Sequence, residues 1–206
     1  MENITKNNSL SENPTPPSTT PVLQKRNEFK ELLKFALIAL PLVLFVRAYV
    51  IGPFIVSGPS MDTTFSSGQY LIVDEISHRF QSPERGDIII FKYPLDTTRF
   101  FIKRIIGLPG ETVEIKNGIV TIINTQYPAG QILIEPYIDE VNKKIDSSHI
   151  VLNNEQYFVM GDNRASSSDS RIWGPITENL IIGRPVLRLL PIQKISVFPG
   201  RQEEYN

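Results

Sequence analysis

A run of apolar residues at positions 32–51 constrains this chain more than any other feature of its sequence. About 20 residues of helix are needed to cross the hydrocarbon core of a bilayer, and this run has that length. Its charged residues, Lys34 and Arg47, lie near the two ends, where long basic side chains can reach the lipid head groups. Pro41 is tolerated in a membrane helix and can kink it. We therefore expect a transmembrane anchor over residues 29–51.

Two other interpretations of this run fit less well. A cleaved export signal would be shorter and would be followed by an Ala-x-Ala-like site, which this sequence lacks. A buried helix of a soluble domain would show a polar face, and this run has none.

Positive residues gather on the N-terminal side of the apolar run, at Lys25, Arg26, Lys30 and Lys34. The positive-inside rule then predicts a single-pass protein of the cell membrane, with a cytoplasmic N-terminus and with the chain after about residue 52 on the outer (periplasmic or lumenal) face.

Composition narrows the possible functions. The chain has 206 residues and a formal net charge of -1, which suits one domain with an anchor and a tail and gives no reason to expect a nucleic-acid partner. It has no Cys, which excludes disulfides and thiolate chemistry. Because His78 and His149 are the only His residues, we expect no metal and no cofactor, although a carboxylate site stays open. Residues 1–24 are rich in Asn, Ser, Thr and Pro, which predicts a disordered cytoplasmic tail.

Beyond the anchor the pattern changes to short runs rich in β-branched residues, separated by turn signals. Strands are predicted over residues 70–73, 87–91, 100–106, 112–115, 118–123 and 157–160, with one or two more over 180–183 and 186–189. Asn117-Gly118 between two such runs predicts a hairpin. Convincing amphipathic helices are absent after the anchor. We expect a mostly β fold, an antiparallel sheet or barrel-like domain over residues 52–206, behind one N-terminal transmembrane helix.

Ser60 lies in the segment Ser57-Gly58-Pro59-Ser60-Met61, shortly after the apolar run. Gly58 and Pro59 break the β-like approach of residues 54–56 just before it. A hydroxyl is a weak nucleophile until a nearby base takes its proton. A nucleophile at a strand end, with its own backbone N–H close by, has the start of an oxyanion hole. Taken alone, a Gly-Pro-Ser turn faces solvent far more often than it catalyses.

Lys103 lies on a predicted strand, where alternate residues share a face. Phe101 and Ile105 therefore flank it, while Arg104 points the other way. Desolvation disfavours a charged amine and lowers the pKa of Lys from about 10.4. A neutral Lys can serve as a general base. Taken alone, a Lys that protects an edge strand from aggregation is the more common role.

A third segment, residues 161–171, mixes hydroxyl groups with alternating charges. Asp162, Arg164, Asp169 and Arg171 can pair with one another and hold a loop rigid. A hydroxyl from this loop could orient the Lys amine by a hydrogen bond. Composition alone favours a plain Ser-rich turn.

Together these segments resemble the boxes of the type I signal peptidases, the membrane-bound Ser/Lys proteases of bacteria and organelles. The resemblance runs from the anchor to about Gly183. It is carried, in order, by Ser60-Met61, by the run Arg85-Gly86-Asp87-Ile88-Ile89-Ile90-Phe91, by Lys103-Arg104-Ile105-Ile106-Gly107, by Gly161-Asp162-Asn163-Arg164, by Ser167 and by Asp169-Ser170-Arg171.

The resemblance implies a β-rich catalytic domain with Ser60 as nucleophile and Lys103 as general base. It assigns supporting roles to Gly58, Ser167, Asp169 and Arg171, and substrate contacts to Val56, Ser57, Met61 and Ile102. Ser167 would orient the Lys amine, Asp169 and Arg171 would form an ion pair, and Val56 and Ile102 would line the pocket for the small residue before the cut.

Two departures from the family pattern stand out. Thr63 occupies a position where the family usually has Pro, which can loosen the turn after Ser60. Gly58 stands where some members use a Ser hydroxyl as an oxyanion donor, so backbone N–H groups are expected to do this here.

We therefore expect signal peptidase I activity, a serine endopeptidase that removes signal peptides from exported preproteins. The expected partners are preprotein signal peptides and membrane lipid, without nucleic acid or metal.

A Ser–His–Asp hydrolase would need His78 or His149 beside Ser60, and both lie in polar stretches. Self-cleaving Ser/Lys repressors carry a DNA-binding domain instead of an anchor. The remaining alternative is a membrane-anchored β-domain that binds or adheres without catalysis, which leaves the joint occurrence of Ser60, Lys103 and Ser167 unexplained.

Overall fold

The computed structural model describes residues 28–49 and 51–201. The chain divides into two compact units, Met1–Leu40 and Pro41–Asn206. The predicted tail over residues 1–24 lies outside the described residues. In the larger unit, every recorded strand pairing is antiparallel, which confirms a mostly β fold.

The helix α1 covers Glu28–Tyr49, with Pro41 inside it. This confirms helical structure for most of the predicted anchor, whose last residue already belongs to the first strand. Among the described residues, no helix has the length and apolar character required to cross a membrane. Insertion of α1 into a bilayer stays a prediction.

The larger sheet has the strand order β1-β2-β11-β3-β4-β9-β10, and β12 pairs with β11. Its strands are β1 (Ile51–Ile55), β2 (Tyr70–Asp74), β3 (Ile88–Tyr93), β4 (Asp96–Gly107), β9 (Gln156–Met160), β10 (Ile176–Thr177), β11 (Ile181–Leu190) and β12 (Ser196–Val197). The smaller sheet has the order β7-β6-β5-β8, with β5 (Thr112–Lys116), β6 (Ile119–Ile123), β7 (Gln131–Ile132) and β8 (Ser148–Val151). Both paths have two ends, so no closed barrel forms among the described strands.

Short helices occupy several connections of the β unit. They are α2 (Ser170–Trp173) and the single turns η1 (Ser77–Arg79), η2 (Glu140–Asn142), η3 (Arg164–Ser166), η4 (Glu178–Leu180) and η5 (Ile192–Lys194). Each has three or four residues, too few to form an amphipathic helix, as the sequence predicted for the part of the chain after the anchor.

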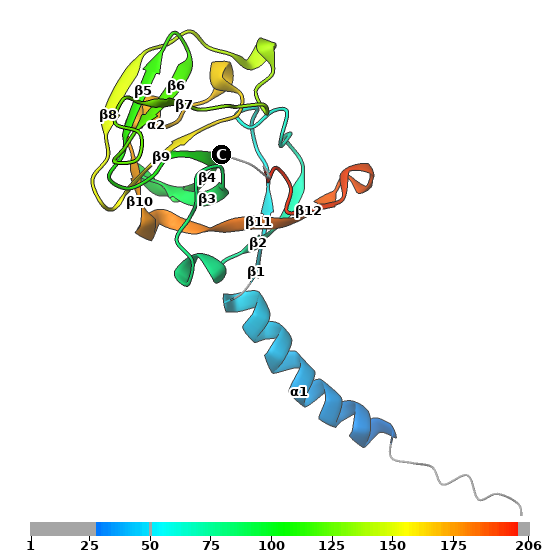
Figure 1. Ribbon diagram of the computed structural model, residues 1–206. Coiled ribbons are helices and arrows are strands. Elements are labelled where there is room, and N and C mark those ends of the chain that lie inside the picture. The colour runs from blue at the N-terminus through cyan, green and yellow to red at the C-terminus, as the bar shows by residue number, and fades with distance from the viewer. Residues whose placement is uncertain (1–27, 50, 202–206) are drawn as a thin grey trace, which may run out of the picture. The chain divides into compact units, whose positions relative to one another are not determined.

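The late strand β11 joins two parts of the larger sheet. It lies between β2 and β3, where Leu187 faces Ile72 and Ile181 faces Phe91. Figure 1 shows β11, in orange, running between the early strands and the green pair β3 and β4. The first two strands are therefore connected to the next two through a strand made much later in the chain.

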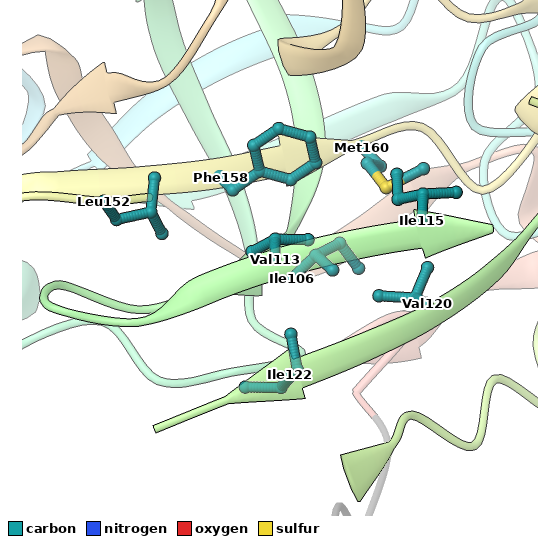
Figure 2. Close-up of a cluster of buried hydrophobic side chains, with 8 residues drawn as sticks. All are labelled: Ile106, Val113, Ile115, Val120, Ile122, Leu152, Phe158 and Met160. Carbon is teal, nitrogen blue, oxygen red and sulfur yellow. The ribbon is translucent and has the colours of Figure 1, made fainter. Parts of the chain in front are cut away.

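Three clusters of buried side chains form the core of the β unit. Figure 2 shows the one between the two sheets, where Phe158 and Met160 of β9 face the strands β5 and β6. Its buried members are Ile106, Val113, Ile115, Val120, Ile122, Leu152, Phe158 and Met160. A second cluster lies around Phe91 and Val159. The third consists of Val56, Met61, Phe65, Leu71 and Ile88, with Ile102 packed against it.

The strong β patterns of the sequence are confirmed as β2, β3, β4, β5, β6 and β9, and the two late runs form the single strand β11. The predicted hairpin is present between β5 and β6, where Asn117 and Gly118 have φ of 53° and 78°. The sequence did not indicate β7, β8, β10 or β12, which have two to four residues each.

Candidate active site

Ser60 and Lys103 meet although they are 43 residues apart in the chain. Strand β1 leads into the turn that carries Ser60, and β4 carries Lys103. The Lys103 amine lies 2.7 Å from Ser60 Oγ, within hydrogen-bond distance, and donates to the carbonyl of Ile102 at 3.0 Å. A hydroxyl and an amine in this arrangement can exchange a proton directly.

The environment of Lys103 makes its amine easier to deprotonate than a solvated one. The residue is 4% exposed, and its amine lies 5.3 Å from the centroid of the Phe101 ring. Burial lowers the pKa of Lys103 to about 8, while the negative charges of Asp169 and Asp162 act in the opposite direction. The sequence prediction that desolvation lowers this pKa is therefore confirmed.

Backbone hydrogen bonds hold the turn that carries Ser60 in place. Asn163 N–H donates to the carbonyl of Ser60 at 3.1 Å, and Asp62 N–H donates to that of Pro59 at 3.1 Å. Gly161 permits this close approach, since a Cβ there would lie 2.3 Å from the carbonyl oxygen of Ser60. The loop after β9 thus positions the backbone of the nucleophile.

A cleft of 610 Å³ opens beside Ser60 and Lys103. Its lining residues come from two stretches, 54–60 and 99–103, together with Leu71, Ile90, Ser166 and Ser168. The predicted substrate contacts Val56, Ser57 and Ile102 are among them, as is Gly58, whereas Met61 is not. Met61 is 0% exposed and packs in the third core cluster with Val56.

Gly58 has a positive φ of 88°, and a Cβ there would meet no atom within 4 Å. Its N–H donates to Ser67 Oγ at 3.4 Å. The backbone before Ser60 therefore adopts a conformation that favours glycine.

The residues 29–190 match the family model described as signal peptidase, peptidase S26. The chain belongs to this family. Like the members of the family, it is a serine endopeptidase. It is 38% identical to "Probable signal peptidase I-1" of Synechocystis sp. over 80% of this chain and 84% of that protein. It is also 37% identical to "Signal peptidase I" of Bacillus amyloliquefaciens over 84% of this chain and 92% of that protein.

In this signal peptidase family member, the predicted ion pair of Asp169 and Arg171 is present. Arg171 Nε and Nη2 donate to the two oxygens of Asp169, each at 2.8 Å, and Gly161 N–H donates to Asp169 at 3.1 Å. Although burial raises the pKa of Asp169, the hydrogen bonds and charge of Arg171 lower it overall. Arg171 also binds Asp146 at 2.6 Å. The carboxylate is therefore ionised and fixed close to the peptidase dyad.

Ser167 is buried next to Gly161, where an added Cβ would lie 2.3 Å from its Oγ. Among the described residues, no hydrogen bond joins Ser167 Oγ to the Lys103 amine. The Ser167 hydroxyl instead interacts with Asp169 and helps to lower the pKa of that carboxyl. Its role in orienting Lys103 stays a prediction.

The pair formed by Arg104 and Asp162 is not indicated by the sequence. Both side chains are 0% exposed, and Arg104 Nε and Nη2 donate to the two carboxylate oxygens at 2.9 and 2.7 Å. Arg104 Nη1 donates to the carbonyls of Gly86 and Gly200. The sequence had suggested partners for Asp162 only inside its own loop, and no local signal could have identified a partner 58 residues away.

A connecting segment between β7 and β8 supports the peptidase site from a direction that the sequence did not indicate. Its Glu135 pairs with Arg164, and the Tyr137 ring centroid lies 3.9 Å from Arg104 Cζ. Asn142 donates to the carbonyl of Asp62 at 3.1 Å. This segment therefore contacts both the loop after β9 and the turn after the nucleophile.

Proposed function

We propose that this peptidase removes signal peptides from exported preproteins, with Ser60 as nucleophile and Lys103 as general base. The observation that carries the assignment is the 2.7 Å contact between the Lys103 amine and Ser60 Oγ. Two further features support it. The pKa of Lys103 is lowered by burial, and the pair opens onto a cleft with mostly apolar walls.

The chemistry follows from this arrangement. Ser60 Oγ attacks the scissile carbonyl while neutral Lys103 accepts its proton and returns it to the leaving amine. Water activated by Lys103 then hydrolyses the acyl-enzyme at Ser60. Ser167 orients the amine, and Asp169 with Arg171 keeps the supporting loop in place.

We propose that the substrate binds in extended form along residues 54–57, where it adds to the strand that leads to Ser60. The side chain before the cut enters the space between Val56 and Ile102. These apolar walls suit a small residue such as Ala.

The direct test is cleavage of a model preprotein by the chain purified in detergent. One new N-terminus, at the junction of signal peptide and mature protein, is the expected product. Covalent labelling of Ser60 by a serine acylator should block this cleavage. An intact preprotein after prolonged incubation would contradict the proposed activity.

Activity should depend on pH through Lys103. Because the neutral amine is the base and its pKa is about 8, kcat/KM should level off above pH 8. Below it, kcat/KM should fall about tenfold per pH unit as the amine gains its proton. A pH–rate profile measures this. If activity rises only above about pH 10, Lys103 is an ordinary solvated amine and is not the base.

We also propose that α1 anchors the peptidase in the membrane, with residues 1–24 in the cytoplasm and residues 52–206 outside. Large apolar side chains of α1, among them Leu32, Phe35 and Ile38, are exposed and could contact lipid. Protease added to the outer face of intact cells or spheroplasts should digest the β unit and leave the tail protected. The reverse protection pattern would refute this orientation.

A further inference from the structure

The cleft beside the dyad is lined by two basic residues, Lys103 and Arg99, and by no carboxylate. Lys103 is engaged with Ser60, whereas Arg99 has no part in the proposed chemistry. Arg99 lies four residues before Lys103 on β4. Since a strand rises by about 3.3 Å per residue, the two positions are about 13 Å apart along the strand. The positive charge of Arg99 therefore lies at a distance from the reacting atoms.

Aromatic rings hold the guanidinium of Arg99 in place. Its Cζ lies 5.6 Å from the ring centroid of Tyr93 and 5.4 Å from that of Phe101, within the range of cation–π contacts. The two rings stack with their centroids 4.6 Å apart, and Trp173 packs edge-on against Tyr93. Arg99 is exposed, so these contacts favour positions of its guanidinium beside the cleft without removing it from solvent.

The hydrogen-bond donors of Arg99 remain available to a ligand. None of the ion pairs found among the described residues involves Arg99. Asp96, on the same strand, interacts with its charge. However, Asp96 Oδ1 already accepts hydrogen bonds from the N–H and hydroxyl of Thr98, at 3.2 and 2.6 Å.

We propose that Arg99 selects substrates by charge and favours an acidic over a basic side chain about four residues before the bond that is cut. This rests on the proposed function, which places the residue before the cut between Val56 and Ile102. The cleft walls formed by residues 54–56 and 100–102 lead from the dyad to Arg99. An extended substrate that follows them therefore presents the residues that precede the cut to the guanidinium. The planar guanidinium matches a carboxylate and repels a second cation.

The test uses synthetic peptide substrates of one sequence with Glu, Gln or Lys placed in turn at the third, fourth and fifth residue before the cut. The wild-type chain should cleave the best-placed Glu peptide with a kcat/KM about tenfold above that of its Lys counterpart, with Gln between them. Arg99→Gln should remove the preference, and Arg99→Glu should invert it. High salt should weaken the preference, because the cleft is open to solvent.

Lys194→Glu is the matched control, because it makes the same change in net charge outside this cleft. It should keep the wild-type preference, and thermal unfolding should show that all three variants are folded. Equal cleavage of the Glu and Lys peptides by the wild-type chain, or an unchanged preference in Arg99→Glu, overturns the role of Arg99 and leaves the proposed function intact. A wild-type chain that cleaves none of the peptides overturns both.

Discussion

Ser60→Ala and Lys103→Ala should each lower the rate of signal-peptide cleavage by about 10³-fold or more, because each removes one half of a proton-transfer pair. The double variant should be no slower than either single one, since residues that act as a unit are strongly non-additive. Lys103→Arg should be equally inactive, because a guanidinium stays charged across the accessible pH range. The measurement is kcat/KM on a model preprotein in detergent.

Two residues away from the site, the partly exposed Ser196 and the exposed Lys116, provide controls of the same chemical types. Ser196→Ala and Lys116→Ala should keep wild-type activity, and circular dichroism should show the same β content in every variant. Activity above about a tenth of wild type in Ser60→Ala or Lys103→Ala would contradict the dyad, because a nucleophile or base that can be removed at so small a cost carries little of the catalysis.

Arg104→Ala should destabilise the β unit by about 3–5 kcal/mol, because it leaves the carboxylate of Asp162 buried without its charged partner and with the hydroxyl of Thr64 as its remaining side-chain donor. Both side chains are 0% exposed, so water does not reach Asp162 while the fold is intact. The variant also removes the hydrogen bonds that Arg104 donates to Gly86 and Gly200. A shift of the urea midpoint at constant slope would measure the loss.

The pair of Arg184 and Asp87 supplies the comparison for this second prediction. Its side chains are partly exposed, and the recorded contact joins Arg184 Nη1 to one carboxylate oxygen at 2.9 Å. Arg184→Ala should therefore cost about 1 kcal/mol or less. Equal losses in the two variants would show that burial of the Arg104 pair does not set its contribution.

Local sequence patterns predicted those strands and turns that form without the help of distant parts of the chain. The apolar run of β3 is buried on both faces of the sheet, so it reads as a strand without knowledge of its neighbours. The hairpin at Asn117-Gly118 follows from backbone conformations that these two residue types adopt easily. By contrast, β7 and β10 have two residues each and exist only because a longer strand offers them a partner.

The candidate site divides in the same way. Ser60 and Lys103 were identified because their segments resemble known boxes, and the structure brings them together. The side chains around them were harder to place. Arg104 has its partner in a loop far along the chain, and Asn142 contacts the turn after Ser60 across 80 residues. Such contacts depend on the final arrangement of both sheets, and no short segment of sequence encodes them.

The position of β11 has a consequence for when this protease becomes active during its own biosynthesis. The turn with Ser60 follows β1, Lys103 lies on β4, and β11 completes the path of paired strands from one to the other. Ribosomes make β11 after all the other strands of the larger sheet except β12. A nascent chain that stalls before residue 181 therefore contains both reacting groups but lacks the strand that unites their supports. We therefore expect the supports of Ser60 and Lys103 to be joined only after synthesis has passed β11.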